Sequence, residues 1–172
     1  MTFDDMDGHM AAGFMSNMFA FVDQQLKTLN DIIAQDMSES GDSGLFDDAE
    51  YFTGIGFLAG QRYIACVCGT LRMSKKEALS LGPKRHNGIA YAALVNAVAN
   101  YWKHSDEWDF EKLSDQQQRT RSEIESIGIT VSDGYVISNV FHALDLKSFS
   151  NLAPLLREWS NAVMEWKERT FG

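Results

Sequence analysis

His86 to Trp108, HNGIAYAALVNAVANYWKHSDEW, is the longest uninterrupted helical pattern in the chain. Its apolar positions recur at steps of three and four, which places them on one face of a helix of 3.6 residues per turn. This face consists of Leu94, Val98, Tyr101, Ser105 and Trp108. The alanines between them favour a helix and let a neighbouring helix approach closely. We therefore expect a helix over residues 86–104 at the centre of a helical fold.

A second line of residues, Asn96, Asn100 and His104, follows an adjacent face of the same helix. Asparagine is a poor residue for a helix interior, because its amide competes for backbone groups. One interpretation is a catalytic site, with His104 as general acid or base and Asn100 as a hydrogen-bonding partner that orients it. The other interpretation is an ordinary polar seam, either solvated or between two helices. The sequence leaves both open.

The length of 172 residues fits one domain, 1–172, with an adequate core, and we expect residues 1–8 to be frayed. The apolar and aromatic content argues against disorder, and only two prolines interrupt the helical patterns. We find neither an apolar run of membrane-spanning length nor the pattern of a signal peptide. The sequence therefore predicts a cytoplasmic protein without membrane contact.

The net charge of −9 is unevenly distributed. Residues 1–50 contain eleven acids and one base, Lys27, and so carry −10, whereas residues 51–172 are nearly balanced. An acidic chain disfavours nonspecific binding of nucleic acid. A local basic patch could still contact phosphate; its candidates are Lys75, Lys76, Lys84 and Arg85, with Lys103 further along the chain. Such cations also occur at ordinary helix ends in solvated loops.

A first helix is expected from about His9 to Met37. Its stripe is Phe14, Met18, Val22, Leu26, Leu29 and Ile33, and further methionines and phenylalanines widen the apolar arc. A helix that is apolar over a wide arc is covered on more than one side. The cover is either the protein's own core or a partner, which would be a second copy in a homodimer or another protein on this acidic helix.

A second helix is expected over Ala49–Arg72. It is apolar nearly all round and should lie centrally, with Gly56 and Gly60 allowing a close helix crossing. Gln61 and Arg62 are its strongly polar interior residues. A buried Arg62 would need an acidic partner, for which Asp23 or Asp31 of the first helix is a candidate.

Four further helices complete the expected fold. A short one lies within Met73–Lys84, where Ser74 and Glu77 form a capping-box pattern. Others cover Ser114–Ile127, capped by Ser114 and Gln117 and ended by Gly128, and Tyr135–Leu144, capped by Ser132 or Asp133. The last begins near Ser150, Asn151 and Pro154. The sequence thus predicts an all-α, single-domain bundle of six or seven helices, with 49–72 and 86–104 at its centre.

The motifs that hold cofactors or metals are not found. Phosphate-binding glycine loops, HExxH and CxxC are absent, and Cys66 and Cys68 point to different sides of their helix. Residues 36–47 have part of the register of a calcium-binding loop, with serines at two ligand positions and Asp47 in place of the final glutamate. We interpret this segment as a plain acidic loop. No cofactor and no metal are expected.

The segment Ala99-Asn100-Tyr101-Trp102-Lys103-His104 resembles the signature of the HEPN superfamily, small all-helical domains of bacterial toxins and defence systems. That signature is an arginine, a polar residue, three variable residues and a histidine, near the C-terminal end of a helix. Asn100 and His104 match it, but Ala99 stands where the arginine belongs. In catalytic members the arginine and histidine, paired across a homodimer, cleave RNA without metal. The resemblance implies His104 as general acid or base and Asn100 as its positioning partner.

Three hypotheses about function follow. The missing arginine favours a non-cleaving, HEPN-like binding protein that engages a nucleotide, RNA or a protein partner. The alternative is an active metal-independent ribonuclease that uses His104. The third hypothesis is a structural helical domain in which the histidine only satisfies a hydrogen bond.

Overall fold

A computed structural model describes residues 6–36, 44–132 and 134–171, and these ranges contain seven α-helices. The helices are α1 (Met6–Asp36), α2 (Leu45–Thr70), α3 (Lys75–Ala78), α4 (Tyr91–His104), α5 (Asp115–Glu125), α6 (Val136–Ala143) and α7 (Leu152–Phe171). Two short 3₁₀ helices, η1 (Ser105–Glu107) and η2 (Phe149–Asn151), follow α4 and precede α7. The described ranges contain no strand, so the predicted all-α fold is confirmed. Of the helices in these ranges, none is both long and apolar enough to cross a membrane.

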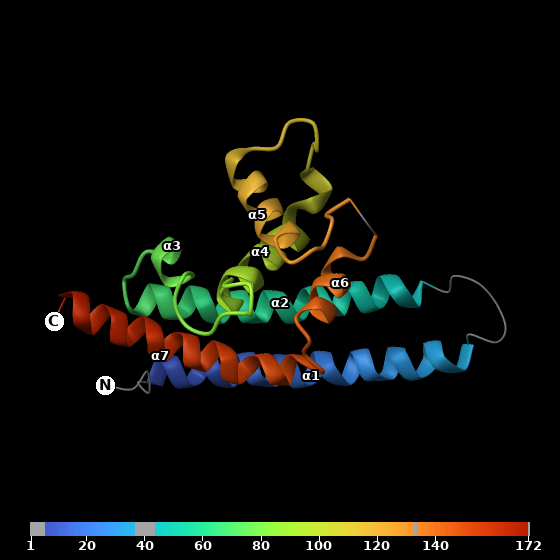
Figure 1. Cartoon of the computed structure of the whole chain (residues 1–172). Coiled ribbons are helices and arrows are strands. Elements are labelled where there is room, and N and C mark those ends of the chain that lie inside the picture. The colour runs from blue at the N-terminus through green and yellow to red at the C-terminus, as the bar shows by residue number, and fades with distance from the viewer. Residues whose placement is uncertain (1–5, 37–43, 133, 172) are drawn as a thin grey trace.

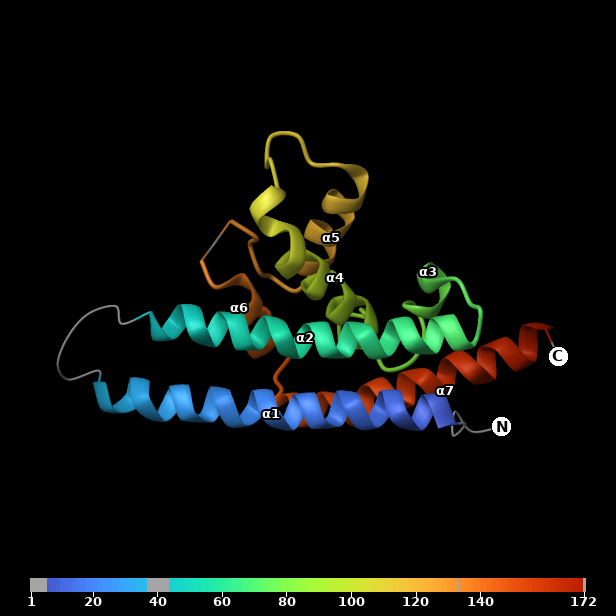
Figure 2. The same ribbon diagram turned by 180° about the vertical axis from the view of Figure 1, so that it is seen from behind.

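α1 and α2 form a long antiparallel pair (Figures 1 and 2). α7 runs along this pair toward the N-terminal end of α1. α2 contacts α1, α3, α4, α6 and α7, so the prediction that this helix is central is confirmed. The C-terminal end of α4 and the whole of α5 project from α2 on the side away from α1 (Figure 1). α5 and α1 therefore lie on opposite sides of α2 (Figure 1).

Glycines let the neighbours of α2 approach closely at three points. A Cβ atom at Gly54 would lie 2.2 Å from the indole nitrogen of Trp102, and one at Gly60 would lie 2.9 Å from Val95, both on α4. At Gly56 the added atom would lie 2.5 Å from the ring of Phe149 in η2. The close crossing predicted from Gly56 and Gly60 is thus confirmed, and Gly54 adds a third contact.

Charged side chains cap helix ends that are distant in the sequence. The Asp23 carboxylate of α1 accepts hydrogen bonds from the backbone N–H groups of Phe149 (2.6 Å) and Ser150 (2.9 Å) in η2. The Glu50 carboxylate of α2 accepts from the first N–H groups of α6, at 2.8 Å each. Arg85 donates from Nη2 to the carbonyl of Ala143 (2.7 Å) at the other end of α6. Both ends of α6 are therefore held by charges from outside that helix.

Several predicted boundaries are wrong. α2 begins at Leu45, four residues before the expected start, and α4 begins at Tyr91 and not at His86. The five residues before α4 form a turn, closed by a bridge between Lys84 and Ala90 and by Gly88 in the left-handed region. Since α1 begins at Met6, residues 6–8 are helical, and residues 1–5 lie outside the described ranges. Most of the 36–47 segment also lies outside them, and Asp47 belongs to the first turn of α2.

The predicted apolar stripe of α1 is buried in part. Val22 and Leu29 are buried and Met18 and Leu26 pack against the core, as do Met15 and Phe19, whereas Phe14 is 54% exposed. This helix is apolar on two sides, so periodicity alone does not select the inner one. Arg62 on α2 is exposed and needs no buried partner, while Asp23 caps η2.

The helix caps follow their sequence signals in part. Ser114 and Gln117 form the predicted capping box of α5, and Gly128 adopts the expected positive φ. Ser74 makes no side-chain cap hydrogen bond to α3, which is only four residues long. The N-terminus of α6 is satisfied by Glu50 and not by Ser132, and Asp133 is outside the described ranges.

We predict that Gly56→Ala destabilises the fold by about 1–3 kcal/mol, because the new methyl group meets the fully buried Phe149 ring. Gly69→Ala, in the same helix but with nothing within 4 Å of the added atom, should stabilise it by about 0.5–1 kcal/mol. Chemical denaturation followed by circular dichroism measures both. Equal effects of the two substitutions would contradict the close approach at Gly56.

Candidate functional site

The asparagine line of α4 is a polar seam between α4 and α2. Gln61 of α2 is buried and donates from Nε2 to the side-chain oxygens of Asn96 (3.1 Å) and Asn100 (2.8 Å). Lys103 in turn donates from Nζ to Oε1 of Gln61 (2.7 Å). The helix-to-helix seam, one of the two interpretations of this line, therefore accounts for both asparagines.

His104 does not take part in the hydrogen bonds of this seam. It is the last residue of α4, its side chain is 53% exposed, and Nδ1 lies 3.5 Å from Oε2 of Glu107. The helix tightens there into η1, which brings Glu107 and Trp108 beside the imidazole. The position of His104 thus results from where α4 ends.

A groove of about 200 Å³ opens beside His104, between the end of α4 and α5. It is lined by Asn100, His104, Glu107, Trp108, Ser114, Gln116, Gln117 and Thr120. The two residues proposed as catalytic from the sequence therefore share one groove. The wall supplied by α5 was not predicted: the Ser114 capping box places the start of that helix along the chain, but no sequence signal places it against α4.

The basic residues proposed for phosphate contact do not gather in this groove. Arg85 caps α6, and Lys76 and Lys84 are exposed outside the groove lining. Burial lowers the pKa of Lys75; the neighbouring Cys68 thiol opposes this shift, and the charge of Lys103 adds to it. Position 99 is fully buried, so the side chain at the arginine position of the HEPN signature faces the core.

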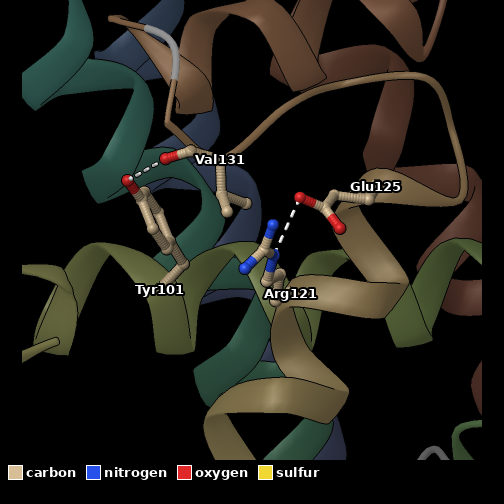
Figure 3. A network of polar contacts seen from close by, with 4 residues as sticks. All are labelled: Tyr101, Arg121, Glu125 and Val131. Atoms are coloured by element: carbon tan, nitrogen blue, oxygen red, sulfur yellow. Dashed lines mark hydrogen bonds and ion pairs between the residues drawn. The ribbon is translucent and has the colours of Figure 1, made fainter. Parts of the chain in front are cut away.

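Two hydrogen bonds and one ring contact lie close to the groove, and Figure 3 shows the hydrogen bonds, Tyr101 with Val131 and Arg121 with Glu125. The Tyr101 hydroxyl of α4 donates to the carbonyl of Val131 (3.2 Å), which ties the segment after α5 to α4. Burial raises the pKa of Tyr101, and the charges of Glu50 and Asp106 raise it further. The Tyr101 ring meets the Trp108 ring edge-on at a centroid distance of 5.1 Å. Within α5, Nε of Arg121 donates to Glu125 (2.9 Å).

The groove offers hydrogen-bonding chemistry. Its lining supplies one imidazole, one carboxylate, three side-chain amides, two hydroxyls and an indole. Among the residues that the structure describes, no cluster of His, Cys, Asp and Glu could hold a metal ion. Such a lining can recognise a small polar group, and a histidine within it could also transfer a proton.

Comparison with known proteins gives no match: no family model, curated protein or solved structure is similar to the chain.

Glu123 on α5 shows how burial affects a carboxyl near this site. It lies on the face beside Asp115 and Arg119, and burial raises its pKa. A carboxyl with a raised pKa in the folded state favours folding most at low pH. This contribution is lost as the pH rises from the unfolded pKa through the folded one. At neutral pH the Glu123 charge therefore opposes folding.

We expect Glu123→Gln to raise the melting temperature at pH 7 and to have less effect at pH 4, because the neutral amide avoids the cost of burying a charge. Glu125→Gln is the matched control, since it removes the partner of Arg121 and should leave stability unchanged or lower it by about 0.3–0.5 kcal/mol. Thermal unfolding at the two pH values measures both. A lower melting temperature of Glu123→Gln at pH 7 would contradict the assignment.

Proposed function

We propose that this is a non-cleaving binding protein of the HEPN-like kind, which holds a polar group of its ligand in the His104 groove. One observation carries the proposal: Asn100 and His104 line one small groove together with neutral hydrogen-bonding side chains of α5. The exposure of His104 and the opening of the groove to solvent favour binding over a purely structural role.

A metal-independent ribonuclease is the less favoured alternative. Cleavage of RNA requires a positive group beside the phosphate as charge develops in the transition state. Ala99 supplies no such group, and the nearest lysine, Lys103, is hydrogen-bonded to Gln61 on the α2 side. Of the residues lining the groove, only His104 can become cationic.

The test is a pair of assays on the wild type and on His104→Ala. Incubation with RNA in the presence of a chelator should give no cleavage that depends on His104. Titration with nucleoside monophosphates and, separately, with short peptides, followed by the NMR signal of the Trp108 indole, should show saturable binding of one of the two classes, which His104→Ala weakens about tenfold or less. RNA cleavage that is lost in a folded His104→Ala variant would establish the ribonuclease instead.

Self-association through the outer face of α1 is a second part of the proposal. Met10, Phe14 and Phe21 are 70%, 54% and 46% exposed. No charged residue occurs between Met10 and Val22, in a chain that carries −9. Two copies repel each other through their acidic surfaces, so an uncharged apolar stripe is the surface on which they can meet. We therefore expect a second copy to bind at this uncharged face of α1 and not at the acidic surface elsewhere.

We predict that the double substitution Phe14→Ser and Phe21→Ser converts a dimer to a monomer, because it removes two exposed rings from the proposed interface. Sedimentation velocity measures the change. Phe110→Ser is the control, since it alters an exposed ring in the segment between η1 and α5 and should leave the dimer intact. A monomeric wild type would refute self-association and leave the stripe to a different protein.

A further inference from the structure

The surface around the groove is acidic. The segment from His104 to Thr120 contains five acids and two bases, Lys112 and Arg119, and all five acids are exposed. The acids are Asp106, Glu107, Asp109, Glu111 and Asp115. Within the described residues none of them forms an ion pair with a lysine or arginine. Such a surface repels a phosphate and attracts a cation, so it is unsuited to RNA.

Trp108 gives an independent indication of a ligand. It is 9% exposed and lines the groove, yet its Nε1–H is buried and has no hydrogen-bond partner among the described residues. A buried indole N–H is usually paired, and leaving it unpaired is unfavourable. An acceptor such as a peptide carbonyl can satisfy this N–H, whereas a metal ion or a protonated amine has no lone pair to accept it.

The size of the groove and the aromatic rings beside it indicate that the ligand inserts one planar side chain. A volume of about 200 Å³ is below that of pockets for drug-sized ligands and fits a single long side chain. Phe110 is partly exposed and meets Trp108 at a centroid distance of 6.0 Å, so an aromatic face lies beside the groove. Guanidinium groups stack on such faces and bind carboxylates, here that of Glu107.

We propose that the groove binds an arginine side chain from a basic peptide segment of a partner protein. The guanidinium pairs with Glu107 and stacks on Phe110, and a backbone carbonyl of the peptide accepts the Trp108 indole N–H. This assignment rests on the proposed binding function and names its ligand class.

The test uses the full chain labelled with ¹⁵N and the blocked tripeptide acetyl-Gly-Arg-Gly-amide. A matched probe carries citrulline, the uncharged isostere of arginine. The arginine peptide should shift the Trp108 indole signal saturably, and the citrulline peptide should bind about tenfold more weakly. Glu107→Gln should cause a similar loss, because its carboxylate is exposed and its removal leaves the fold intact. Glu111→Gln, in the same acidic segment but outside the groove lining, should change affinity less than twofold.

Each other outcome is decisive. Equal binding of the arginine and citrulline peptides overturns recognition of a cation. A shift of the Trp108 signal by adenosine monophosphate but not by the arginine peptide overturns the ligand class and leaves the binding function standing. If no probe perturbs the Trp108 signal at millimolar concentration, both proposals fail. Loss of binding in Glu111→Gln to the same degree as in Glu107→Gln would show a diffuse charge effect and no site.

Discussion

Gly54, Gly56 and Gly60 remove side chains from α2 at the points where α4 and η2 cross it, and the rest of the fold depends on these close contacts. The space left by each glycine is filled by a large or branched side chain, Trp102, Phe149 or Val95. Because protein interiors are close-packed, neither the glycine backbone nor the side chain that fills its space can move independently. Phe149 then completes a ring cluster with Phe19, Phe57 and Phe141, which joins α1, α2 and α6 into one core.

Charged residues that look like surface features in the sequence hold this core at its edges. Asp23 and Glu50 belong to the acidic N-terminal region, and Arg85 belongs to the basic patch, yet all three bind backbone groups at helix ends. Short helices such as α6 need this support, because one or two turns are marginal on their own. A run of charged residues in a helical protein can therefore serve to cap the ends of distant helices and need not bind a ligand.

The sequence predicts the fold better than it predicts the site. Long periodic patterns locate α1, α2, α5 and α7 well, since burial of an apolar face determines both the pattern and the helix. Prediction fails at the start of α4, where turn geometry around Gly88 overrides helical periodicity. In α1 the apolar pattern leaves the inner side open, and the structure buries Phe19 and exposes Phe14. The candidate groove is predicted only in part: Asn100 and His104 form a visible pattern in the sequence. The wall from α5 depends on a long-range contact that no local signal encodes.

The steric contacts and the hydrogen bonds between α2 and α4 both require the same axial register of the two helices. Sliding α4 by one turn, about 5.4 Å, would move Asn96 and Asn100 away from Gln61 and would also drive Trp102 off the space at Gly54. Either change is unfavourable on its own, and both would occur together. Asn100 belongs at once to this locked seam and to the lining of the groove. The core thereby fixes the position of this wall of the groove, so the wall is preorganised.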